Sequence, residues 1–113
     1  MSRLEGYRFG RVLVDGREET RDLIVLPGRL VRNWWRRDGH SLVAEDLADI
    51  VDELPERLIV GSGASGQMRP DPATVEQLRG RGVEVEVFRT DEAVARFGSL
   101  DPARTAAALH LTC

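Results

Sequence analysis

The chain has 113 residues, with 16 basic residues, all Arg, against 19 acidic ones, so its formal net charge at pH 7 is −3. A content of 42% apolar and 31% charged residues is typical of a globular protein and excludes fibrous and low-complexity classes. The length fits one compact domain over residues 1–113, and no apolar run approaches the roughly 20 residues of a membrane-spanning helix.

The N-terminal segment is predicted to form an antiparallel hairpin. Residues 9–14 alternate partly in apolar character and stop at Asp15-Gly16, a dipeptide that favours a two-residue turn with positive φ. A second apolar run, residues 22–26, follows and is predicted to be the partner strand. Residues 30–36 are short, aromatic and arginine-rich, which predicts a further extended segment.

The period changes between residues 42 and 54, where apolar side chains recur on one helical face. These side chains are Val43, Leu47, Ile50, Val51 and Leu54. The opposite face is acidic, Ser41 precedes the segment as a candidate N-cap, and Pro55 follows it. The pattern therefore predicts a helix over residues 42–54.

A buried strand is predicted next, because residues 58–60 form the continuous apolar run Leu-Ile-Val. A strand of this kind, buried on both faces, indicates a parallel or mixed sheet. Asp71-Pro72 then predicts the start of a helix, with Asp as the N-cap and Pro in the first turn. Residues 83–87 alternate Val with Glu, which predicts a half-exposed strand.

The C-terminal part is predicted to contain one more helix and a final strand. Thr90 is the expected cap of a helix that buries Ala93, Val94 and Phe97. Asp101-Pro102 repeats the helix start signal, and the tail 106–113 is predicted as a short helical turn followed by a strand. The order of elements predicts an α/β fold: a single three-layer domain with a mixed central β-sheet, an N-terminal hairpin and helices packed on it.

The loop after the buried strand is the first candidate site. Residues 61–66 read Gly-Ser-Gly-Ala-Ser-Gly, which matches the G-x-G-x-x-G pattern of dinucleotide sites. Residues 67–70 separate this loop from the next helix, and Glu86, at the spacing of a ribose-binding acid, lies in mid-strand. A structural loop is therefore favoured over a small-anion site, and a full nucleotide site is favoured least. The candidate ligand-binding residues are Gly61, Ser62 and Gly63.

The segment 29–37 is the second candidate site, because it interleaves guanidinium groups with indoles. Its candidate residues are Arg29, Arg32, Trp34, Trp35, Arg36 and Arg37. Arg bonds carboxylates in a bidentate manner and Trp offers a large contact area, so the combination suits an interface. The alternative is that one Trp fills the core while the arginines pair with the acidic helix face. In a strand, Trp34 and Trp35 point to opposite faces, so at least one needs cover elsewhere.

The remaining polar residues predict no reaction. The net charge and the lack of an RNA-binding aromatic signature argue against nucleic acid. His110 lies three residues before Cys113 without a further catalytic partner, so a packed tail is favoured over a nucleophile. His40 and His110 make no recognisable metal site. We therefore expect no metal and no cofactor, and we favour a protein that is not an enzyme.

The expected compartment follows from the single Cys and from the N-terminus. One Cys excludes an internal disulfide and is typical of a reducing environment. Residues 1–6 contain no apolar run of the kind that directs secretion. We expect a cytoplasmic protein that makes no contact with a membrane.

Five segments spread over nearly the whole chain carry a family resemblance. They are YRFG (7–10), LIVLPGR (23–29), NWWR (33–36), GSG (61–63) and AALHLTC (107–113). They resemble the MTH nine-three-eight-like family, a domain of unknown function that includes the adipogenesis-associated domain protein and a mitochondrial assembly factor for respiratory complex I. The resemblance implies a compact three-layer α/β fold with a mixed sheet, and a role as an assembly or signalling partner. It assigns no catalytic residue.

Two functions are consistent with these residues. The leading hypothesis is a non-catalytic protein-interaction or assembly module that meets a protein partner through residues 29–37. The alternative is a small-ligand or anion-binding protein, or an unassigned enzyme, that uses the loop 61–66 with a nearby arginine such as Arg29 or Arg69.

Overall fold

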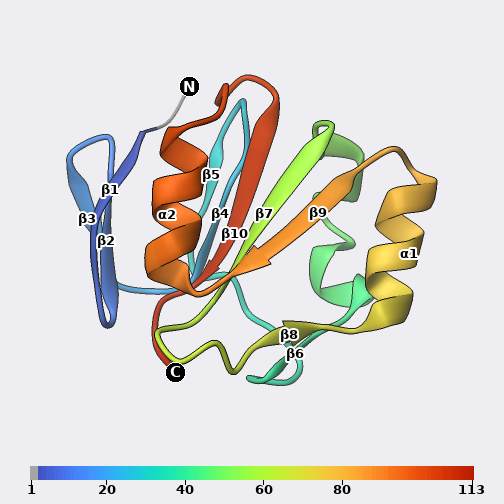
Figure 1. Cartoon of the computed structure of the whole chain (residues 1–113), viewed down its shortest axis with the longest axis horizontal. Coiled ribbons are helices and arrows are strands. Elements are labelled where there is room, and N and C mark those ends of the chain that lie inside the picture. Colours follow the sequence, from blue (N-terminus) through green and yellow to red (C-terminus); the bar gives the residue numbers. More distant parts are fainter. Residues whose placement is uncertain (1–2) are drawn as a thin grey trace.

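A five-stranded mixed β-sheet forms the centre of the fold (Figure 1). In spatial order its strands are β5 (Leu30–Val31), β4 (Leu23–Val25), β10 (Thr105–His110), β7 (Arg57–Ser62) and β9 (Glu84–Phe88). Strands β10, β7 and β9 are parallel, whereas β4 is antiparallel to β10 and to β5. The computed structural model describes residues 3–113, so residues 1 and 2 of the predicted domain lie outside the described residues. The predicted mixed α/β class is confirmed.

The N-terminal strands form a separate antiparallel sheet of β1 (Leu4–Arg8), β2 (Arg11–Val14) and β3 (Arg17–Glu19). The predicted turn is confirmed, because Asp15 and Gly16 have φ of 52° and 82° and connect β2 to β3. The predicted partner strand is wrong, since residues 22–26 contribute β4 to the central sheet. All three residues of β4 are buried, and a strand that is apolar on both faces needs cover on both sides.

Helices cover both faces of the central sheet, which gives the predicted three layers. Helix α2 (Thr90–Gly98) packs on one face together with the N-terminal sheet, and it buries Ala93, Val94 and Phe97 as predicted. The predicted cap at Thr90 is wrong, because Thr90 is the first residue of the helix and Arg89 precedes it as the N-cap. Helix α1 (Pro72–Gly80) lies on the other face (Figure 1). Its predicted cap is confirmed, because the Asp71 carboxylate accepts a hydrogen bond from the Ala73 N–H at 3.2 Å.

The predicted continuous helix over residues 42–54 is wrong. The segment forms β6 (Ser41–Leu42) and two 3₁₀-helices, η1 (Ala44–Leu47) and η2 (Val51–Glu53). The Asp46 carbonyl, which in an α-helix would accept the Ile50 N–H, accepts the indole N–H of Trp34 at 2.9 Å. The Ile50 N–H donates to the Leu47 carbonyl at 3.0 Å instead. The prediction of which face is apolar is nevertheless confirmed for Leu47 and Ile50, which are buried. Strand β6 pairs in parallel with β8 (Arg69–Pro70).

Two further predictions differ from the structure. The extended segment 30–36 is a strand only over β5, and the rest of it is irregular. Asp101 starts a turn instead of a helix, with the Arg104 N–H donating to the Asp101 carbonyl at 3.0 Å. The predicted helical turn at the start of the tail is also wrong, because β10 already covers these residues. The final strand is confirmed as β10, whose six residues are all buried. No helix within residues 3–113 is long and apolar enough to cross a membrane.

Candidate functional site

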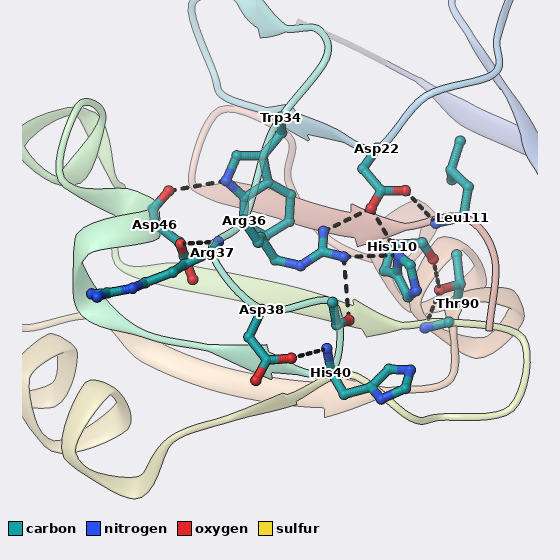
Figure 2. A network of polar contacts seen from close by, with 12 residues as sticks. Asp22, Trp34, Arg36, Arg37, Asp38, His40, Asp46, Thr90, His110 and Leu111 are labelled. Carbon is teal, nitrogen blue, oxygen red and sulfur yellow. Dashed lines mark hydrogen bonds and ion pairs between the residues drawn. The ribbon is translucent and has the colours of Figure 1, made fainter.

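The irregular segment after β5 holds the two tryptophans, and the structure sends them in different directions. Asn33 has a left-handed φ of 53°, and the Trp34 N–H donates to the Asp22 carbonyl at 2.9 Å. Trp34 is only 8% exposed, and its indole N–H donates to the Asp46 carbonyl at 2.9 Å (Figure 2). Trp35 is 77% exposed. One indole is thus part of the core, and the other is left in solvent.

A buried polar network joins this segment to the end of β10 (Figure 2). The Arg36 guanidinium lies 5.0 Å from the centre of the Trp34 ring and donates to Asp22 Oδ2 at 2.7 Å. The same Asp22 oxygen is 2.7 Å from His110 Nδ1, and Arg36 Nη2 is 3.0 Å from that nitrogen. The Arg36 side chain is 5% exposed and that of His110 is 9% exposed. The network therefore closes off the end of the strand.

The network keeps Asp22 ionised. Burial by itself raises the pKa of the Asp22 carboxyl, but hydrogen bonds from His110, the Leu111 N–H and Arg36 outweigh it and lower the pKa. The Leu111 N–H donates to Asp22 Oδ1 at 2.8 Å, so both carboxylate oxygens are occupied. Pairing an ion in this way offsets the cost of removing it from water.

The network extends through Thr90 to the glycine-rich loop (Figure 2). The Thr90 hydroxyl donates to the His110 carbonyl at 2.6 Å and accepts the Gly63 N–H at 2.8 Å. Ser62, the register neighbour of His110 on β7, donates its hydroxyl to the Phe88 carbonyl at 2.8 Å. An aspartate–histidine pair can orient an imidazole for proton transfer. Here the neighbouring hydroxyls are engaged with backbone carbonyls, and Arg36 shares the carboxylate, so the arrangement fits a structural clamp.

The other arginines of segment 29–37 pair with carboxylates of the same chain. Arg29 donates to both oxygens of Glu53, at 2.9 and 2.7 Å, and Arg32 donates to Glu19 at 3.0 Å. Arg37 pairs with Glu45 on η1. Solvent screens the pairs of Arg29 and Arg37, so these pairs add little to stability. They leave Trp35, and not the guanidinium groups, as the uncommitted contact group of the segment.

The loop 61–66 packs against the C-terminal tail. The Ala64 N–H donates to the Thr112 carbonyl at 2.8 Å, and the Ser65 N–H donates to the Cys113 carbonyl at 3.1 Å. Gly63 has a φ of +104°, and a Cβ built there would lie 2.5 Å from the Cys113 carbonyl carbon. The backbone donors that would cradle a pyrophosphate therefore bind the tail. Glu86, the candidate ribose acid, pairs with Arg57 and Arg96.

A cavity of about 590 Å³ adjoins this loop at the ends of β7 and β9. It is lined by Ser62, Ser65 and Gly66 together with Arg69 and Arg89. Of the two arginines considered from the sequence, the structure brings Arg69 to the loop and places Arg29 elsewhere, on Glu53. Among residues 3–113, Arg69 has no ion-pair partner. No group of three His, Cys, Asp or Glu side chains in this part of the chain is arranged to hold a metal ion.

Sequence reasoning missed Asp22 as a member of the site. The signal was weak: an acidic residue stands directly before the apolar run that becomes β4. The three partners of its carboxylate, two side chains and one backbone N–H, are distant in sequence, at separations of 14 for Arg36, 88 for His110 and 89 for Leu111. No local pattern can report such pairings.

Comparisons with known proteins give a family and a fold. Residues 4–110 match the family named Protein of unknown function (DUF498/DUF598). A conserved hypothetical protein from Pyrococcus horikoshii is 29% identical over 98% of this chain and 99% of its own, with a TM-score of 0.82. The protein MT938 is 28% identical over 100% of both chains, with a TM-score of 0.79. A Mth938-like domain from Bordetella pertussis, at 19% identity and a TM-score of 0.72, covers 97% of this chain and 85% of its own and shares the fold.

The network predicts that Asp22→Asn destabilises the protein by about 3 kcal/mol at pH 7, because Arg36 is left as a buried charge without its carboxylate. The lowered pKa of Asp22 stabilises the fold above about pH 4, and this contribution is lost as the pH falls through the folded-state pKa. Urea unfolding at pH 7 and in acid, below the ordinary Asp pKa of 3.8, measures both effects. Glu76→Gln, which removes the exposed pair with Arg79, is the control and should cost less than about 1 kcal/mol. An equal loss at both pH values for Asp22→Asn would contradict the role of the ionised carboxylate.

The close approach of the tail predicts that Gly63→Ala destabilises the fold by roughly 2–4 kcal/mol, from backbone strain at positive φ together with the clash against the tail. The matched control is Gly80→Ala, where a Cβ meets nothing within 4 Å at the end of α1. That variant should be neutral or stabilised by up to about 1 kcal/mol. Denaturant midpoints of the two variants give the comparison, and similar midpoints would show that the tail does not constrain Gly63.

Proposed function

The chain belongs to the DUF498/DUF598 family of proteins of unknown function, as its resemblance to the MTH nine-three-eight-like family implied, and we propose that it is a non-catalytic protein-interaction module. The contact surface centres on Trp35, which is exposed over 77% of its area. This exposure is the observation that carries the proposal. Trp is enriched among the residues that contribute most to binding at protein interfaces.

The backbone around Trp35 favours binding because its neighbours are already fixed. Trp34 is anchored to Asp46 and Asp22, and Arg36 is held by Asp22 and lies over the Trp34 ring. Ordering a flexible segment on binding costs free energy, and a segment held in this way avoids much of that cost. Trp35 is therefore presented by a rigid support.

Two hollows in the surface flank Trp35. One, of about 520 Å³, lies towards η1, and the other, of about 360 Å³, lies towards Asp22. Both are lined by Asn33, Trp34 and Trp35. A large exposed indole between two hollows can bury apolar area against a partner while flanking groups of that partner enter the hollows.

The state of the polar groups supports binding over catalysis. The Asp22 carboxylate accepts hydrogen bonds from the Arg36 guanidinium and from His110 Nδ1. A substrate would have to displace these partners before it could reach a reacting group. Trp35 needs no such rearrangement.

Affinity capture followed by binding measurements with the purified partner tests the proposal. Trp35→Ala should weaken binding about 30-fold, corresponding to about 2 kcal/mol. It should change stability by less than about 0.5 kcal/mol, because the side chain is exposed. The matched control is Phe9→Ala, which removes an aromatic side chain that is 67% exposed outside this surface. An unchanged set and affinity of partners for Trp35→Ala would contradict the proposal.

A second function is favoured by the cavity beside the glycine-rich loop, with Arg69 and Arg89 in its lining. Arg69 has no ion-pair partner among residues 3–113 and can turn towards an anion, whereas Arg89 lies 3.9 Å from Asp91 and 3.5 Å from Glu92. Parallel strands place ligand sites at their carboxyl ends, where this cavity lies. This second function is the small-anion alternative, in which the loop does not bind a nucleotide.

Thermal unfolding with added inorganic phosphate tests this alternative. Binding predicts stabilisation of about 2.7 kcal/mol at a hundredfold excess over the dissociation constant. Arg69→Ala should abolish the stabilisation, whereas Arg8→Ala, which removes another exposed arginine, should retain it. A flat response of the wild-type protein would contradict phosphate binding at this cavity.

A further inference from the structure

The hollow between Trp35 and η1 has a lining that favours a positively charged ligand. We refer to it as the Trp35 hollow. Its lining residues are Ile24, Val31, Asn33, Trp34, Trp35, Arg37, Glu45, Asp46, Asp49 and Ile50. Three of these are carboxylates and one is a guanidinium, so the hollow carries an excess of negative charge over an apolar floor. Its volume of about 520 Å³ is within the range of small ligand sites.

The three carboxylates differ in what they bind. Asp46 accepts two backbone N–H groups, from Arg37 and Val43, and Glu45 pairs with the Arg37 guanidinium. Asp49 is exposed and has no hydrogen bond or ion pair with any other residue in the range 3–113. One carboxylate in the lining is therefore uncommitted, and it shares the hollow with the exposed indole.

We propose that the Trp35 hollow binds an arginine side chain of a partner protein. The guanidinium would stack on the Trp35 ring and donate hydrogen bonds to the Asp49 carboxylate, while its aliphatic stem packs on Val31. This inference rests on the proposed function and names the chemistry of the partner. Opposite charge, the exposed ring and the size of the hollow agree on the same occupant.

The protein already contains the same combination in its interior. Arg36 lies 5.0 Å from the centre of the Trp34 ring and donates to the Asp22 carboxylate at 2.7 Å. Trp35 and Asp49 provide a second indole ring and a second carboxylate. An arginine from a partner would complete the same combination. Arg suits this position better than Lys, because its planar group can stack on an indole and bond a carboxylate in its own plane at the same time.

Titration with capped peptides tests the inference on the whole chain. Acetyl-Gly-Arg-Gly-amide is the probe, with its Lys and Glu counterparts for comparison, and the indole N–H of Trp35 is followed by NMR up to about 20 mM peptide. The arginine peptide should shift the resonances of Trp35 and Asp49. The lysine peptide should bind at least about threefold more weakly, and the glutamate peptide should leave these resonances in place.

Variants assign the binding to the two groups. Asp49→Asn should weaken binding of the arginine peptide about fivefold, and Trp35→Ala should abolish it. The matched control is Glu84→Gln, which neutralises another exposed carboxylate that has no ion pair within residues 3–113 and should change binding less than about twofold. Equal binding of the glutamate peptide, an equal loss in Glu84→Gln, or no shift at Trp35 would overturn the inference.

The captured partner separates this inference from the proposed function. If capture depends on Trp35 but not on Asp49, the inference of a bound arginine is overturned, and the proposed interaction surface still stands. Capture that depends on neither residue overturns the proposed function itself. A shift of the Trp35 resonance with protein concentration that Asp49→Asn removes would show that a second copy of this chain fills the hollow, and it would overturn the assignment to a different protein.

Discussion

The Asp22 carboxylate is the interaction on which the rest of the site depends. It stands at the start of β4 and bonds the Arg36 guanidinium, the His110 imidazole and the Leu111 N–H. These groups belong to the aromatic segment and to the end of β10, so one partly buried carboxylate bonds two chain segments at the end of the central sheet (Figure 2). Its cost of desolvation is offset only while all of these partners stay in place. The aromatic segment and the tail are consequently ordered together.

This clamp decides the roles of the two adjacent tryptophans. With Arg36 tied to Asp22, Trp34 is held beneath the guanidinium and inside the core, and Trp35 has no position left except the surface. The alternative in which one Trp fills the core holds for Trp34, whereas Trp35 is exposed. Arg29 and Arg37 pair with carboxylates of the acidic segment that follows, whereas Arg32 and Arg36 pair with Glu19 and Asp22 before it.

The glycine-rich loop illustrates how a motif can serve the fold. Gly63 lets the tail approach to backbone contact, and the N–H groups of Ala64 and Ser65 bond the carbonyls of that tail. In a dinucleotide site the same backbone freedom admits a pyrophosphate. The cavity beyond the loop depends on side chains instead, with Arg69 and Arg89 in its lining. The N–H groups of the loop are therefore not free to hold a pyrophosphate.

Features set by neighbouring residues were determined by the sequence: the turn at Asp15, the cap at Asp71, the buried strand β7 and the apolar face of α2. Each follows from local backbone preference or from the period of apolar residues. Only the tertiary structure decided the pairing of β4, the break of the helix expected over residues 42–54, and the exposure of Trp35. These features depend on contacts between residues far apart in the chain. A carboxylate such as Asp22 bonds groups that are close in space but distant in sequence, and the periodicity of apolar residues does not indicate which groups these are.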